Sequence, residues 1–337
     1  MKVAIYGAGI TGNRFYKAIS KEIKIDFFID KYKSGNFNDI PIIGVDKIPK
    51  DTIIYNSVMG FDQEIYKELK EIYKDLKSKN IIFVFFSESL KKFHDIINEF
   101  YKEKYLWFNG NRLNDRLKEV RKLLHDKVSL NFFDNWVKFR ETFDMKYYPY
   151  PTNSLEEQYF IDEFKHSERF VDCGGFTGDT ISAYYRYNKG RIISFEPDPT
   201  NLKKLNKSAK NKDVLVYPMG VFDETKILKF KSCGSGGNLC EEGDILVPVT
   251  SLDETIYNFR PDYIKMDIEG AEIEAIKGAK NIIKDFSPNL AISIYHKASD
   301  LWEIPLLIKE INPKYEFKIR SHNHLCLETI LYCKVES

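Results

Sequence analysis

Four ionisable residues in the second half of the sequence each stand at the end of an apolar run that predicts a strand: Asp172, Glu196, Asp267 and His296. The carboxyl ends of parallel strands meet at one edge of an α/β sheet, which is where such sheets bind ligands. We therefore expect these four side chains to converge on one crevice. A histidine and several carboxylates in one crevice are typical of sites that move a proton on or off a substrate.

Asp267 and His296 are the candidate catalytic residues. A neutral alcohol is a poor nucleophile and gains from a base that removes its proton as a new bond forms. His296 has a suitable intrinsic pKa for this role, and Asp267 could be the base, orient His296 or hold the acceptor hydroxyl. The alternative for His296 is a buried histidine bonded to backbone. Glu269 and Glu272 fit the start of a helix, where the dipole favours acids, but with Asp267 they could instead bind magnesium.

The residues from Arg169 to Phe195 predict the βαβ unit that would position these groups. An apolar run is followed by a turn through Gly174, Gly175 and Gly178, then by a helix and a second apolar run. Glycines allow the backbone to approach a ligand closely because they carry no Cβ. Glu196 lies 18 residues after Gly178, close to the offset of about 20 residues that brings an acid to a ribose.

No GxGxxG frame fits this turn, and an acid precedes the glycines, as in S-adenosylmethionine (SAM) methyltransferases. VDCGGFTGDT, FEPDP, VPVTSLDE and YIKMDIEGAEIEAIKGA follow in the order and spacing of the FkbM-type SAM-dependent methyltransferases, which this chain resembles from about Asn153 to Cys333. The resemblance implies SAM as cofactor, an Asp172 that faces its methionine part, and a helix at 156–160 beside the pocket. It implies these cofactor-binding residues: Asp172, Gly174, Gly175, Thr177, Gly178, Asp179, Thr180, Glu196, Pro197, Asp198, Gly220 and Val221.

A second glycine turn stands near the N-terminus. The strand Lys2 to Tyr6 precedes GAGITG, a GxGxxG motif made of three glycines: Gly7, Gly9 and Gly12. Asp30 ends the next strand, 25–29, again 18 residues past the last glycine. Residues 2–88 resemble the small N-terminal domain of bacterial sugar acyltransferases, in which this loop and acid hold the nucleotide of an activated sugar. The alternative is a glycine turn kept for tight strand–helix packing.

Residues 91–138 show helical periodicity throughout and predict a helical connector. Pro149 and Pro151 mark its end. The predicted domains are a Rossmann-like nucleotide(-sugar)-binding domain at 1–90, the connector at 91–150 and a SAM methyltransferase domain at 151–337. The fold class is α/β: a Rossmann-like methyltransferase domain with a smaller Rossmann-like half domain before it.

Composition narrows the classes of partner. The 337 residues include 51 lysines and arginines against 50 acids, a balance that argues against nucleic-acid binding. The longest apolar runs fall far short of the roughly 20 residues of a membrane span. Five cysteines without a CxxC pair favour a reduced, cytoplasmic setting and no zinc site. A homo-oligomer is compatible with this composition.

We therefore expect a SAM-dependent O-methyltransferase. The two resemblances together suggest a nucleotide-activated or glycan-linked sugar hydroxyl as acceptor, in surface polysaccharide or glycan biosynthesis. Two alternatives stay open. One is a nicotinamide-dependent oxidoreductase acting through Gly7 to Gly12, which lacks a catalytic set in that half of the chain. The other is a non-catalytic module that binds SAM or a nucleotide sugar.

Overall fold

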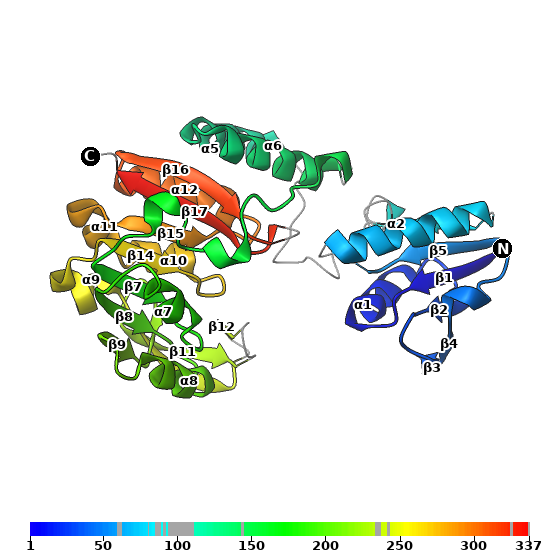
Figure 1. Cartoon of the computed structure of the whole chain (residues 1–337), viewed down its shortest axis with the longest axis horizontal. Coiled ribbons are helices and arrows are strands. Elements are labelled where there is room, and N and C mark those ends of the chain that lie inside the picture. Colours follow the sequence, from blue (N-terminus) through cyan, green and yellow to red (C-terminus); the bar gives the residue numbers. More distant parts are fainter. Residues whose placement is uncertain are drawn as a thin grey trace. The chain divides into compact units, whose positions relative to one another are not determined.

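The computed structural model describes residues 1–58, 63–79, 81–84, 89, 92–93, 111–142, 145–232, 237–240, 243–323 and 326–335. The chain forms two compact units, one of residues 1–109 with 134–149 and the other of residues 110–133 with 150–337 (Figure 1). Each unit is built around its own sheet. Among the described residues, none of the helices has the length and apolar character needed to cross a bilayer.

The N-terminal unit has a six-stranded sheet in the order β3-β4-β2-β1-β5-β6, in which only β3 pairs antiparallel. Its elements are β1 (Lys2–Tyr6), α1 (Ile10–Ile19), β2 (Phe27–Ile29), β3 (Gly35–Phe37), β4 (Ile40–Ile43), η1 (Val45–Lys47), β5 (Thr52–Asn56), α2 (Gln63–Ser78), β6 (Ile82–Val84) and the 3₁₀ turn η2 (Met145–Tyr147). The hairpin β3–β4 was not predicted. It turns at Asn38 and Asp39, which both have positive φ, as a two-residue hairpin turn requires.

The C-terminal unit has a seven-stranded sheet in the order β16-β17-β15-β14-β7-β8-β9. Its strands are β7 (Arg169–Cys173), β8 (Arg191–Phe195), β9 (Val214–Tyr217), β14 (Tyr263–Met266), β15 (Asn289–Ser293), β16 (Tyr315–Ser321) and β17 (Thr329–Val335). All neighbours pair parallel except β17, which is antiparallel to both β15 and β16. The strand order reverses between β7 and β14, so the ligand crevice of such a sheet is expected there.

Helices and 3₁₀ turns precede and connect these strands, as the Rossmann-like prediction requires. They are η3 (Leu155–Glu157), η4 (Asp162–Phe164), α7 (Asp179–Tyr184), α8 (Pro199–Ala209), α9 (Leu252–Ile256), η6 (Tyr257–Phe259), α10 (Glu272–Lys277), α11 (Lys280–Phe286) and α12 (Asp300–Ile311). The start of α8 shows why the chain turns into a helix directly after β8. Asp198 caps it by accepting from the amides of Thr200 and Asn201, and Pro199 occupies the first helical position.

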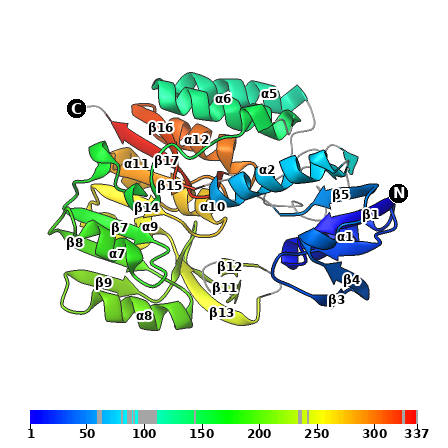
Figure 2. The same ribbon diagram turned by 45° about the vertical axis from the view of Figure 1, so that its right-hand side comes forward.

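A separate four-stranded sheet follows β9 in the chain, in the order β10-β13-β11-β12 (Figure 2). Its strands are β10 (Gly220–Val221), β11 (Lys226–Lys231), β12 (Asn238–Leu239) and β13 (Ile245–Thr250). This sheet is an insertion between β9 and α9, and it ends at the TSLDE segment. Ser251 then caps α9 by accepting from the amide of Glu254 at 3.2 Å.

Two helices lie in the predicted connector, α5 (Asn111–Leu123) and α6 (Lys127–Thr142), while residues 94–110 lie outside the described part of the chain. The helical periodicity does not show the break between them. Asp126 accepts from the amides of Val128 and Ser129, and so caps a new helix start. The Ser129 hydroxyl accepts from the amide of Ile319 at 2.9 Å, which ties this break to the edge strand β16.

Candidate functional site

The predicted strand-end residues lie at one edge of the seven-stranded sheet. Glu196 and Asp267 come directly after β8 and β14, Asp172 is the penultimate residue of β7, and His296 lies three residues after β15. The Asp267 amide donates to the carbonyl of Cys173 at 3.1 Å, so the ends of β7 and β14 are tied together. The structure thus brings Asp267 next to the glycine turn that follows β7.

The glycines of that turn are required by the packing of the protein itself. Gly174 and Gly178 have φ of +86° and +87°. A Cβ on Gly174 would lie 2.0 Å from the carbonyl oxygen of Asp267, and one on Gly175 would lie 2.2 Å from Oγ of Ser194. A ligand that approaches closely, our sequence-based reason for these glycines, is therefore not needed to explain them.

Glu196 holds the turn from the neighbouring strand. Its carboxylate accepts from the amide of Phe176 at 2.8 Å and from that of Asp198 at 2.9 Å. The side chain is buried, and burial raises the pKa of Glu196 to about 7 against the lowering effect of these two hydrogen bonds. Each oxygen keeps a second lone pair, so the carboxylate could still accept from the two hydroxyls of a ribose.

Asp172 forms a buried ion pair that the sequence analysis missed. Lys265 stands opposite it in β14, and Nζ lies 3.0 Å from Oδ1 of Asp172. Both side chains are almost completely buried. The ammonium also donates to the carbonyl of Gly174 at 2.7 Å, and the Asp172 charge keeps the pKa of Lys265 raised despite burial. The signal in the sequence was a single lysine inside the apolar strand YIKM.

The remaining predicted cofactor residues surround the same turn. Thr180 is buried and Asp179 exposed in the first turn of α7, and the carbonyl of Thr177 accepts from Ser208. Asp198 is buried and serves as the cap of α8, a structural use of its carboxylate. Gly220 and Val221 form β10 and pair with β13. A Cβ on Gly220 would lie 3.7 Å from Cγ of Pro197, so β10 is adjacent to the end of β8.

Asp267 is the centre of a network of phenols. Oδ2 accepts from the Tyr159 hydroxyl at 2.6 Å, and Oδ1 lies 3.3 Å from both the Tyr295 hydroxyl and Nε2 of His296. Burial acts to raise the pKa of Asp267, but the charges of His296 and Lys265 and the Tyr159 hydrogen bond together lower it. Asp267 is therefore ionised and a weak base.

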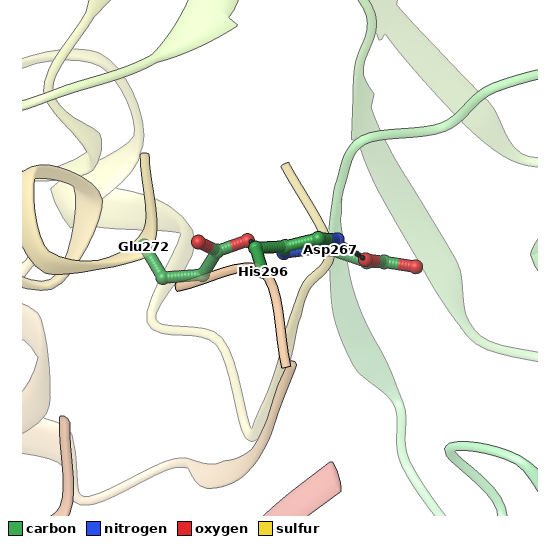
Figure 3. Close-up of side chains that lie close together, drawn as sticks. All are labelled: Asp267, Glu272 and His296. Atoms are coloured by element: carbon green, nitrogen blue, oxygen red, sulfur yellow. Dashed lines mark hydrogen bonds and ion pairs between the residues drawn. The ribbon is translucent and has the colours of Figure 1, made fainter. Parts of the chain in front are cut away.

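His296 lies between two carboxylates (Figure 3). Nδ1 is 2.9 Å from Oε1 of Glu272, and Nε2 faces Asp267 at 3.3 Å and Glu269 at 3.8 Å. Burial would lower the pKa of His296, but Glu272, followed by Asp267 and Glu269, outweighs burial and raises this pKa to about 10. An imidazolium cannot accept a proton. The structure therefore favours a positioning role for His296 over the general-base role that we expected.

Glu272 begins α10, as expected of an acid at a helix start, and its Oε1 also accepts from the amide of Ile268 at 3.0 Å. Asp267, Glu272 and His296 offer ligand atoms within 4.8 Å of one another. Magnesium fits this arrangement poorly, because one of the three ligand atoms is an imidazole nitrogen and the two carboxylates contact different nitrogens of the ring (Figure 3). Magnesium also prefers oxygen ligands in a near-ideal octahedron. Glu269, the other predicted ligand, approaches the same nitrogen as Asp267.

Glu328 joins this network through the Tyr295 hydroxyl, which lies 3.1 Å from its Oε2. Three non-glycine residues of the network have left-handed backbone: Tyr159 at φ 68°, Glu269 at 55° and Glu328 at 51°. Such conformations are unfavourable, and they persist at functional sites when the surroundings enforce them. Tyr159 and Glu328 were missed as site residues. Tyr159 lies in the segment at 156–160 that the resemblance placed beside the pocket, and Glu328 directly precedes the apolar strand β17.

His322, which flanks the last strand pair, has a structural role. Nδ1 lies 2.7 Å from the carbonyl of Ser154, and Nε2 lies 3.0 Å from the Tyr332 hydroxyl. The side chain is buried and both ring nitrogens are used, so no nitrogen is left for an acceptor. His324, the other histidine of this segment, lies outside the described residues.

The N-terminal glycine turn is also shaped by packing, at two of its three glycines. Gly7 has φ +102°, and a Cβ on Gly12 would lie 2.0 Å from the Gly7 carbonyl oxygen, whereas a Cβ on Gly9 would meet nothing within 4 Å. Asp30 accepts from the amides of Ala8, Tyr32 and Lys33 at 2.8–3.0 Å. Its carboxylate thus joins the glycine turn to the end of β2.

The fold is that of a Rossmann-like α/β domain, and the candidate site residues lie at the carboxyl ends of its strands β7, β8 and β14. Residues 172–324 match the model of the Methyltransferase FkbM domain. The C-terminal region is therefore a methyltransferase domain of the FkbM type.

Two similar proteins agree with this assignment, the second through its fold alone. Hexuronic acid methyltransferase AglP of Haloferax volcanii is 25% identical over 159 residues, which are 44% of this chain and 65% of AglP. The crystal structure of Methyltransferase FkbM from Methylobacillus flagellatus KT superposes with a TM-score of 0.77 at 23% identity, over 98% of this chain and 89% of that one. That fold therefore extends beyond the matched domain and includes the N-terminal unit.

Proposed function

We propose that the protein is a SAM-dependent O-methyltransferase that methylates a sugar hydroxyl in glycan or surface polysaccharide biosynthesis. The FkbM domain supplies the reaction class. The sugar acceptor is supported by the similarity to AglP, whose name states that it methylates a hexuronic acid. The same acceptor suits the crevice, because carboxylates and phenols are the groups that bind the hydroxyls of a sugar.

One observation carries the proposal. A Cβ on Gly174 would collide with the Asp267 carbonyl oxygen, so the glycine turn beside Glu196 and the acidic network around Asp267 are in direct contact. A nucleotide held by Glu196 would therefore place its far end next to Asp267. SAM bound there would supply a methyl group on a sulfonium, which an acceptor oxygen attacks in line.

This chain's own residues would align the acceptor rather than bond to the methyl group. Asp267 is ionised and held by Tyr159 and His296, so it can accept a hydrogen bond from the acceptor hydroxyl in a fixed geometry. Fixing two reactants in a near-attack arrangement accounts for a large part of the rate of such displacements.

The test is transfer of a labelled methyl group. Enzyme and SAM with a trideuterated methyl group are incubated with UDP-glucose, UDP-glucuronic acid, UDP-N-acetylglucosamine and free glucuronic acid, and products are analysed by mass spectrometry. We expect the labelled methyl group on a hydroxyl oxygen of one acceptor and equimolar S-adenosylhomocysteine. The Glu196→Ala variant is the control, and label transfer that is independent of Glu196 would contradict the proposed site.

We also propose that the N-terminal unit binds the nucleotide part of an activated sugar at the turn of Gly7, Gly9 and Gly12. The open space at Gly9 and the ammonium of Lys33, which donates to the Ala8 carbonyl at 2.8 Å, favour an anion there. Gly9→Val should abolish binding of UDP-glucose without disturbing packing, while SAM affinity is kept. Equal UDP-glucose affinity of both proteins, or none in either, would leave this turn a packing feature.

A further inference from the structure

Glu328 lies at the same edge of the seven-stranded sheet as Asp267, but it comes from the start of an antiparallel strand. β17 runs antiparallel to β15, so the start of β17 lies at the carboxyl end of β15. The amide of Ile294 donates to the carbonyl of Thr329 at 3.0 Å, which fixes this approach. Glu328, directly before β17, therefore lies at the same edge of the sheet as the acids that follow the parallel strands.

The contacts of Glu328 connect it to the network around Asp267. Oε2 accepts from Nε2 of Gln158 at 2.6 Å and from the Tyr295 hydroxyl at 3.1 Å. The same hydroxyl lies 3.3 Å from Oδ1 of Asp267, so Tyr295 bridges the two carboxylates. Both hydrogen bonds end at Oε2 of Glu328, and none of the described residues donates to its Oε1.

The surroundings shift the pKa values of Glu328 and Asp267 in opposite directions. Burial and then the charge of Asp267 raise the pKa of Glu328, against the lowering effects of Gln158, Tyr295 and His296. The pKa of Asp267 is instead lowered by His296 and Lys265. Neighbouring carboxyl groups with pKa values pushed apart are the usual arrangement when one acts as a base and the other stays ionised.

We propose that Glu328 is the general base of the proposed methyl transfer, while His296 and Tyr159 hold Asp267 ionised to position the acceptor. The inference rests on the proposed function. The acceptor oxygen forms a bond to the methyl carbon, and the carbon–sulfur bond of the sulfonium breaks with its electron pair left on sulfur. The acceptor proton moves to the Glu328 carboxylate, so the sulfonium and carboxylate charges both disappear. The left-handed backbone of Glu328 agrees with a functional position.

The first test uses Glu328→Gln, which is nearly isosteric and can still accept from Gln158 and Tyr295 through its amide oxygen. We expect kcat to fall by about 10²–10⁴-fold, the usual contribution of a general base, with SAM affinity within twofold of wild type. The matched control is Glu316→Gln, at an exposed position of β16, which should leave kcat unchanged. A Glu328→Gln enzyme within threefold of the wild-type kcat would overturn the assignment.

The pH profile separates a base from a structural residue. For the wild type, kcat/KM should rise with pH as Glu328 loses its proton, and Glu328→Gln should lack this rise. Tyr295→Phe removes a hydrogen bond that lowers the pKa of Glu328, so its rise should move to higher pH. This second variant decides the question if Glu328→Gln does not fold. An unmoved rise in Tyr295→Phe, or a retained rise in Glu328→Gln, refutes the role.

These outcomes differ from a failure of the proposed function. If wild-type enzyme transfers no methyl group from SAM to any acceptor tested, the proposed function fails before Glu328 is examined. If the wild type transfers methyl groups and Glu328→Gln does so equally well, the function stands and only the assignment of the base is wrong.

Discussion

Replacing Lys265 by methionine should destabilise the C-terminal unit strongly. Methionine has a similar shape, but Asp172 would be left as a buried carboxylate without its partner at 3.0 Å. Removing one member of a buried pair costs about 3–5 kcal/mol. The substitution also removes the hydrogen bond from Nζ to the Gly174 carbonyl, which adds to the destabilisation and is included in this range. We therefore expect a loss of about 3–5 kcal/mol in the free energy of unfolding.

Urea denaturation followed by far-UV circular dichroism measures this change. The matched control is Lys318→Met, which removes a partner of Glu163 at 2.6 Å in a pair that is about one third to one half exposed. Such a pair contributes only about 0–1 kcal/mol. In Lys265→Met, the charge that most lowers the pKa of Asp172 is gone and only the Ser194 hydrogen bond still lowers it, so the lost stability should partly return as the pH falls and Asp172 takes up a proton.

Adding Asp172→Asn to Lys265→Met should restore part of the lost stability, because the unpaired charge is removed. The two changes would then be non-additive, as a double-mutant cycle detects. A loss below about 1 kcal/mol for Lys265→Met, or an equal loss with and without Asp172→Asn, would refute the reasoning. The glycine turn would then not depend on this ion pair.

Three further predictions follow from the same contacts. SAM affinity should rise with pH through about 7, since Glu196 has a pKa of about 7 and its ionised form accepts ribose hydroxyls best. Calorimetry at several pH values measures this, and an affinity that does not change with pH would contradict it. The pKa of His296 is raised from 6.5 to about 10 in the folded state, so wild-type stability should fall as pH rises through that interval, and His296→Ala should lack this fall in urea midpoints. Gly12→Ala should destabilise the N-terminal unit because its Cβ would meet the Gly7 carbonyl oxygen, whereas Gly9→Ala should not; equal thermal midpoints would contradict the packing account.

The sequence predicted the residues that end strands, because an acid after an apolar run is a local pattern. Glu196 and Asp267 lie directly after β8 and β14, as expected. The partners that set the charges could not be found in this way. Lys265 reaches Asp172 across a strand pairing, and Tyr159 reaches Asp267 from 108 residues away. These contacts depend on strand register and tertiary packing, which no local pattern encodes.

The same limit explains why the charge state of His296 was not predicted. Its position after a strand predicted a base with an ordinary pKa, whereas the fold surrounds it with Glu272, Asp267 and Glu269. Helix periodicity failed for a similar reason at residues 124–126, where Asp126 starts a new helix and its side chain also pairs with Arg320 at 3.1 Å. A contact from β16 thus fixes a break that the local pattern does not show.

The most direct test of the central claim is isothermal calorimetry of SAM with wild type, Glu196→Ala and the exposed control Glu316→Ala. We expect one SAM bound per chain with micromolar-range affinity in the wild type and the control. In Glu196→Ala the free energy of SAM binding should weaken by roughly 1.5–3 kcal/mol, the scale of hydrogen bonds to a charged group. No binding of SAM to the wild type, or equal affinity in all three proteins, would contradict a cofactor crevice at Glu196.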